Sequence, residues 1–103
     1  MDIHTDGPIL VLAGEFDVRS TREVRSALYD HLEQHDQDVV VDLSQVTHID
    51  LTALKVLAVA TRFAERAGRH LVLRGCRPGV RRLMHLSHLF RLVEVERAGQ
   101  QTA

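Results

Sequence analysis

The fold is decided by Val39-Val40-Val41-Asp42-Leu43 and by Asp50-Leu51-Thr52-Ala53-Leu54, which residues 44–49 connect. The first stretch is short, apolar and β-branched, which is typical of a buried strand. We expect residues 44–49 to form a brief polar loop, after which Asp50 opens a long apolar helix as its N-cap, with its side chain accepting a hydrogen bond from an early helix N–H. This order places the hydroxyl of Thr52 in the first turn of a helix. Backbone N–H groups are unpaired there and the helix dipole favours negative charge, so the position suits a reversible phosphate.

Length and composition limit the class of protein. The chain has 103 residues, enough for one domain with its own apolar core and too few for two. Its 13 Lys and Arg against 14 Asp and Glu give a net charge of −1, which provides no general attraction to nucleic acid or to an anionic membrane. The single cysteine, Cys76, excludes an internal disulfide and fits a reducing cytosol. Because the chain shows neither a signal sequence nor an apolar run long enough to span a bilayer, we expect a cytoplasmic protein.

Strand and helix signals alternate along the chain. We expect strands near Ile3 and over residues 9–13, 70–74 and 92–95, in addition to the strand at 39–43. Helices are predicted to begin at a capping box over 20–23, near residue 51 and at Pro78, and the second of them ends at Gly68. The expected buried set of the third helix is Val80, Leu83, Met84 and either Leu86 or Leu89.

This order of elements predicts an α/β fold. We expect a mixed, mostly parallel sheet of four or five strands, with an N-terminal antiparallel strand pair and with helices packed against the sheet. Residues 1–103 form a single domain in this interpretation. Its core covers about residues 3–97, and residues 98–103 form a flexible tail.

Three groups of residues resemble the STAS domain of bacterial anti-sigma-factor antagonists. Gly14-Glu15-Phe16-Asp17 looks like the Gly-Glu-Leu-Asp with which that family ends its second strand. Residues 40–44 and 49–54 are similar to its strand, loop and phospho-acceptor motif, and residues 71–83 are similar to its last strand-helix unit. Because the three groups follow in the family's order, the resemblance implies the STAS fold.

The resemblance also implies a regulatory function without catalysis. In that family an unphosphorylated antagonist binds an anti-sigma factor that is itself a serine/threonine kinase, and phosphorylation by this kinase switches the antagonist off. Carried over by position, Thr52 is the phospho-acceptor, Asp50 is its flanking acid and Asp17 is a partner-facing acid in the neighbouring loop. Near the end of the third helix His88 stands where glycine is common, and two positions beside the acceptor also depart from the family pattern. Leu51 stands where a small hydroxyl residue is usual, and Ala53 stands where glycine is usual.

The second helix carries a further candidate surface. At about 100° per residue, Thr52, Val56, Val59 and Phe63 lie along one narrow stripe. Basic residues border this stripe on its other side: Lys55, Arg62 and Arg66. The stripe either receives a partner helix or loop or is the edge of the core under a neighbouring element. Our predicted partner-binding residues are Asp17, Asp50, Leu51, Ala53, Val56 and Val59.

Other sequence signals are weaker evidence for a functional site. His85 and His88 are three residues apart, a spacing that metal ligands can have, but no convincing third ligand follows. A local basic cluster of Arg74, Arg77, Arg81 and Arg82 lacks the interleaved aromatic residues of a nucleic-acid site. We therefore expect no catalytic residue, metal, cofactor, nucleic acid or membrane partner. Two other functions stay open: a STAS interaction or scaffold protein that works without phosphorylation, and a STAS module that senses a small ligand.

Overall fold

The computed structural model describes residues 1–96, and the tail expected over residues 98–103 lies outside the described residues. The predicted alternation of strands and helices is present, with one additional 3₁₀ helix near the end. The elements are β1 (Asp2–Asp6), β2 (Ile9–Phe16), α1 (Thr21–Gln34), β3 (Val39–Ile49), α2 (Leu51–Arg66), β4 (Leu71–Arg74), α3 (Pro78–Leu86), η1 (Leu89–Leu92) and β5 (Glu94–Val95).

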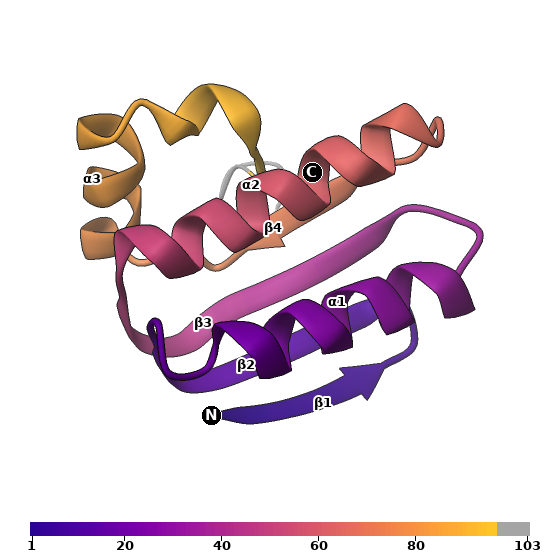
Figure 1. Ribbon diagram of the computed structural model, residues 1–103, viewed down its shortest axis with the longest axis horizontal. Helices are drawn as coiled ribbons and strands as arrows, with labels where there is room; N and C mark the ends of the chain where they lie inside the picture. Colours follow the sequence, from indigo (N-terminus) through magenta and orange to yellow (C-terminus); the bar gives the residue numbers. More distant parts are fainter. Residues whose placement is uncertain (97–103) are drawn as a thin grey trace, which may run out of the picture.

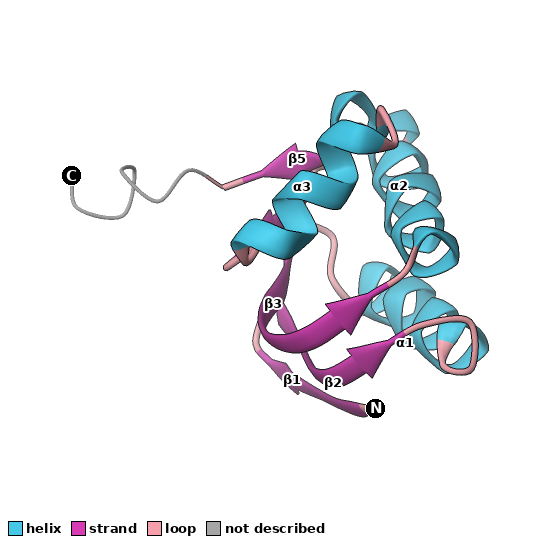
Figure 2. Cartoon of the chain, turned by 90° about the vertical axis from the view of Figure 1, so that its left-hand side faces the viewer, coloured by secondary structure: helices cyan, strands magenta, loops and turns pink. Residues whose placement is uncertain are grey.

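The five strands form one mixed sheet in the order β1-β2-β3-β4-β5. β1 runs antiparallel to β2, and each later pair is parallel. Each strand lies beside the one before it, and parallel crossover connections are right-handed, so α1 and α2 fall on the same face of the sheet. Figures 1 and 2 show these two helices side by side on that face. The predicted fold class is confirmed.

Aliphatic side chains fill the space between the sheet and the helices. Alternate residues of the strands point toward the helices and are buried: Leu10, Leu12, Val39, Val41, Leu71 and Leu73. The helices contribute Val24, Leu28, Leu54, Leu57, Ala60 and Ala64 to the same cluster. Removing this apolar surface from water is the main favourable term in folding. The packed sheet holds β2 and β3 in a register that ends with Phe16 opposite Ile49.

The polar loop predicted over residues 44–49 is wrong, because these residues form the second half of β3. They pair in parallel with the end of β2, and the register shifts by one residue at two places. Each shift inserts one additional residue into β3, as in a β-bulge. Buried side chains therefore recur every third residue, at Leu43, Val46 and Ile49. This spacing lacks the alternation by which a strand is recognised in a sequence.

The ends of α1 and α2 test two predicted boundaries. Gly68 has a φ of +75° directly after the C-cap of α2, as predicted for a residue past a helix end. The capping box over residues 20–23 is wrong, since the Ser20 side chain makes no cap hydrogen bond. Its hydroxyl instead donates to the Asp17 carbonyl at 3.2 Å and accepts from the Asp17 N–H at 3.3 Å. The loop between β2 and α1 therefore uses the hydroxyl that the helix was expected to use.

The third helix begins at Pro78 as predicted. Val80 and Met84 are buried and Leu83 is partly buried. Of the two alternatives for the last buried position, Leu89 packs on the core, whereas Leu86 is 69% exposed. His88 turns the chain between α3 and η1 with a φ of +64°, a conformation that histidine adopts more readily than most residues. Because the chain continues into η1, β5 is shorter than the strand predicted over 92–95.

Substitution of Gly75 tests the packing of β4 against β3. Gly75 has a φ of +71°, and a Cβ atom there would lie 2.8 Å from the Cβ of Ser44. We expect Gly75→Ala to lower the free energy of unfolding by about 3 kcal/mol, through backbone strain and the steric clash. Gly68→Ala is the matched control, because its φ is +75° but no atom lies within 4 Å. The free energy of unfolding of Gly68→Ala should fall by only about 1 kcal/mol. Equal losses in urea unfolding would contradict the predicted clash.

The pH dependence of stability tests the contact between His70 and β5. His70 Nδ1 lies 2.5 Å from Glu94 Oε1, and this hydrogen bond raises the pKa of His70 above its ordinary value of 6.5. A raised pKa means that the folded state binds the proton more tightly than the unfolded state. The resulting stabilisation is complete below the unfolded pKa of about 6.5 and is lost as the pH rises through the folded pKa.

We therefore expect the free energy of unfolding of the wild type, relative to Glu94→Gln, to be larger at about pH 5.5 than at about pH 8.5. Urea unfolding of both proteins at the two pH values measures this difference. A difference that does not change with pH would show that the ion pair makes no contribution in solution.

Candidate protein-binding site

The carboxyl ends of β2 and β3 form the base of the candidate site. Phe16 and Ile49 are the last paired residues of these parallel strands, and the Asp50 N–H donates to the Phe16 carbonyl at 3.3 Å. The loop from β2 to α1 and the connection from β3 to α2 therefore leave the sheet next to each other. Binding sites in open α/β sheets are commonly built at this edge.

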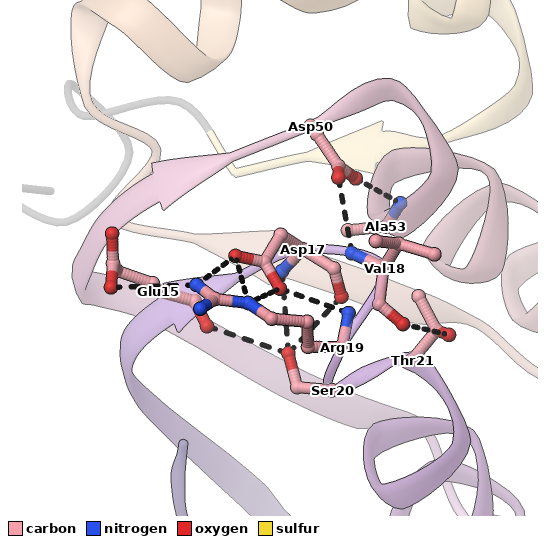
Figure 3. Close-up of polar contacts among 8 residues, drawn as sticks. All are labelled: Glu15, Asp17, Val18, Arg19, Ser20, Thr21, Asp50 and Ala53. Carbon is pink, nitrogen blue, oxygen red and sulfur yellow. Dashed lines mark hydrogen bonds and ion pairs between the residues drawn. The ribbon is translucent and has the colours of Figure 1, made fainter.

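Asp50 joins these two connections through its carboxylate. Its Oδ1 accepts from the Ala53 N–H at 2.8 Å, which makes Asp50 the predicted N-cap of α2. Its Oδ2 accepts from the Val18 N–H at 3.0 Å, in the loop 32 residues earlier in the chain. Figure 3 shows both bonds. One side chain thus caps the helix and positions the neighbouring loop against the helix start.

Asp17 lies in the same loop, but Arg19 covers its carboxylate. Arg19 Nη2 lies 2.7 Å from Asp17 Oδ2, and the Arg19 N–H donates to Oδ1 at 3.0 Å. These side-chain and backbone hydrogen bonds lower the pKa of Asp17. The side chain of Asp17 is 14% exposed and that of Arg19 is 74% exposed. At this loop, the Arg19 guanidinium is therefore more accessible to solvent than the Asp17 carboxylate, which was the predicted partner-facing acid. A contact between Asp17 and a partner stays a prediction.

Thr52 is exposed in the first turn of α2, as the sequence predicted. Its neighbour Leu51 is 42% exposed, and Val18 in the adjoining loop is 62% exposed. Val18 was not among the residues predicted for the site. Its signal in the sequence is an isolated large apolar residue within the polar loop over 17–20. The structure thus brings a hydroxyl and two exposed apolar side chains to the edge that Asp50 organises.

The predicted partner-binding residues of α2 and the rest of its stripe divide into a buried set and an exposed set. Ala53 is fully buried and Val56 is 7% exposed, whereas Val59 is 60% and Phe63 is 47% exposed. The methyl group of Ala53 therefore points into the core, and the Ala53 N–H donates to Asp50. Val56 lies at the margin of the core, and Val59 has the side chain available to a partner. Whether these residues bind a partner stays a prediction.

Two hollows follow the exposed part of the stripe. The first, of about 200 Å³, is lined by Arg25, Tyr29, Thr52, Lys55, Val56 and Val59. The second, of about 300 Å³, is lined by Tyr29, Ala58, Val59, Arg62, Phe63, Arg66 and Leu92. They share Tyr29 and Val59, and the rings of Tyr29 and Phe63 meet edge to face at 5.1 Å between centroids. All charged residues that line the two hollows are basic, and we call this surface the basic groove.

The weaker signals of the sequence have structural roles. Among residues 1–96, no three His, Cys, Asp or Glu side chains are grouped as metal ligands. The ring of His85 stacks on Phe90 at 4.4 Å between centroids, and His88 occupies the turn after α3. Burial raises the pKa of the Cys76 thiol, which keeps it in the unreactive protonated form. In the same part of the chain, none of the helices has the length and apolarity needed to cross a bilayer.

The chain belongs to the STAS domain family, since the family model described as Mlab, STAS domain, matches residues 1–94. Solved structures of similar fold include TM1081 of Thermotoga maritima, which is 18% identical over 98% of this chain and 90% of that chain, with a TM-score of 0.77. An anti-sigma factor antagonist from Mycobacterium paratuberculosis is 24% identical over 90% of this chain and 80% of that chain, with a TM-score of 0.69.

The anti-sigma factor antagonist SpoIIAA of Bacillus also has this fold. Its unphosphorylated form is 12% identical over 98% of this chain and 91% of that chain, with a TM-score of 0.69. A structure of SpoIIAA in its phosphorylated form has a TM-score of 0.66. At these identities the likeness establishes a common fold.

Removal of the Asp50 carboxylate tests its double role. We expect Asp50→Ala to lower the free energy of unfolding by about 2 kcal/mol, because α2 loses its cap and the Val18 N–H loses its acceptor. Hydrogen exchange at the Val18 amide should accelerate as well. Asp36→Ala is the control, since Asp36 is exposed and caps no helix, and it should change stability by less than about 0.5 kcal/mol. Unchanged exchange at Val18 would contradict the bridging role.

Proposed function

We propose that this chain is a cytoplasmic, non-catalytic protein-binding module that antagonises an anti-sigma factor. The observation that carries the proposal is the exposed residue Thr52, on the same edge as the exposed side chains of Val18 and Leu51, in two connections that Asp50 holds together. Exposed apolar residues at an organised loop edge suit a protein partner. Membership of the STAS family and the fold shared with anti-sigma factor antagonists support this function.

The proposed partner is an anti-sigma factor that is also a serine/threonine kinase. In the switching step, the Thr52 hydroxyl oxygen attacks the γ-phosphorus of ATP bound to the kinase. An oxygen–phosphorus bond forms, the bond to ADP breaks, and the hydroxyl proton passes to a base on the kinase. This chain contributes an exposed hydroxyl at a helix N-terminus, where the dipole favours the resulting phosphate.

The phosphate acts in this proposal on the interface and leaves the fold intact. Asp17 and Asp50 already use their carboxylates in hydrogen bonds, and Arg25 and Lys55 line the same hollow as Thr52. The fold can therefore accommodate about −1.5 to −2 added charges. The interface with the partner cannot accommodate this charge, because an unmatched charge in a closed interface costs about 2–5 kcal/mol. Phosphorylation would thus release the partner by electrostatic exclusion.

A second candidate is a STAS interaction protein that works without phosphorylation. It is favoured by Leu51, whose bulky side chain is 42% exposed directly before the acceptor hydroxyl. In a kinase active site that accepts only a small residue before the acceptor, the Leu51 side chain would clash and hinder phosphorylation of Thr52. A ligand-sensing STAS module is the third candidate, and the two hollows along α2 are where such a ligand would bind.

Binding and phosphorylation should be measured with the kinase-type anti-sigma factors of the organism that encodes this chain. We expect the wild type to bind one of them and to be phosphorylated at Thr52 when ATP is added. Thr52→Asp should weaken binding by at least about tenfold, whereas Thr52→Ala should bind but accept no phosphate. Thr5→Asp, at an exposed threonine of β1, is the control and should behave as the wild type.

The outcomes separate the candidates. Equal binding by the wild type and Thr52→Asp, without phosphate transfer, would exclude the switch and favour the phosphorylation-independent protein. Failure to bind any anti-sigma factor would overturn the proposed function.

A further inference from the structure

We propose that the basic groove along α2 binds an acidic amphipathic helix of a partner protein. This inference rests on the proposed function only in taking the chain to be a protein-binding module. It requires neither phosphorylation nor an anti-sigma factor as the partner. The groove joins the exposed stripe of α2 to Arg25 and Tyr29 of α1 on one side and to Leu92 of η1 on the other.

The floor of the groove is apolar and accessible. Val59 is 60% and Phe63 is 47% exposed, although a helix packed on a sheet normally turns its large apolar side chains inward. Tyr29 holds the ring of Phe63 edge to face, so the ring is ordered before any partner arrives. A preformed apolar floor reduces the entropy that binding costs. This floor provides the hydrophobic contact that a helix-in-groove complex needs.

The rim of the groove has positive charge that the protein does not neutralise. Its basic residues are Arg25, Lys55, Arg62 and Arg66. Over the described residues 1–96, Arg25, Lys55 and Arg66 make no ion pair or side-chain hydrogen bond. Arg62 Nε lies 3.8 Å from Glu65 Oε1 in an exposed ion pair, which is a weak contact. The net charge of the whole chain is −1, so this concentration of cations is local and selects an acidic partner.

The dimensions and the arrangement of charge favour a helix as the occupant. The part of α2 from Thr52 to Arg66 spans about 21 Å, which corresponds to about four turns of a bound helix. Apolar side chains at every third or fourth position of that helix would rest on Val59 and Phe63. Carboxylates on its two flanks would face Arg25 on one side and the other rim cations on the opposite side.

The groove is also linked to the proposed switch. Thr52 lines the first hollow together with Arg25 and Lys55. A phosphate on Thr52 would compete with the carboxylates of a bound helix for these two cations. We therefore expect phosphorylation at Thr52 to weaken the binding of an acidic helix at the near end of the groove.

Two designed peptides of about 15 residues provide the probes. Both carry leucine at every third or fourth position, and one has glutamate on both flanks where the other has lysine. Fluorescence anisotropy with the full chain should show the acidic peptide binding at least about tenfold more tightly than the basic one. Its affinity should fall as the salt concentration rises.

Variants locate the binding surface. Lys55→Glu and Val59→Asp should each weaken binding of the acidic peptide by about tenfold. Both positions are exposed, so the fold should be retained. Arg82→Glu makes the same charge change at an exposed residue of α3 and should leave binding unchanged. Urea unfolding of all three variants verifies that they are folded.

Equal binding of the two peptides, or no loss of affinity in Lys55→Glu, would overturn the proposal. Dimers that Val59→Asp dissociates in sedimentation would assign the groove to a second copy of the chain. Binding to anionic vesicles that the acidic peptide does not displace would assign it to a membrane surface. Either of these results would overturn the proposal that the groove binds an acidic helix. Peptide binding without binding to any anti-sigma factor would overturn the proposed function alone.

Discussion

The carboxylate of Asp50 is the contact on which the candidate site depends. It accepts one hydrogen bond at the start of α2 and another from the loop that precedes α1. The parallel pairing of β2 with β3 brings these two segments together, and the carboxylate then fixes their relative position. An N-cap at the end of a buried strand thereby becomes a link between two loops. Val18, Leu51 and Thr52 share one edge because of this link.

α2 performs three tasks with different parts of its surface. Its inner face supplies Leu54, Leu57 and other core residues, its first turn presents Thr52, and its outer stripe forms the floor of the basic groove. These tasks are compatible because successive residues of a helix point in different directions. The buried face holds the helix on the sheet, so the other two surfaces are rigid. A rigid presentation suits recognition by partners, since little order must be gained on binding.

Local patterns predicted the elements well where neighbouring residues decide them. The N-cap at Asp50, the stop at Gly68 and the start at Pro78 all depend on residues within one helical turn. The capping box at Ser20 failed because the hydroxyl found partners in the preceding loop. The sequence pattern indicates a loop for the second half of β3 because two bulges interrupt its alternation, and only pairing with β2 shows that it is a strand.

The sequence by itself determined the order of strands and helices, the STAS fold and the position of Thr52 in the first turn of α2. Tertiary structure decided which residues meet at the site. The bond from Val18 to Asp50 joins residues 32 apart, and the contact of Tyr29 with Phe63 joins two helices. It also decided that Ala53 and Val56 are buried and that Arg19 covers Asp17. Helix caps and turns depend on residues close in the chain, whereas these contacts depend on the strand register and on the packing of α1 beside α2.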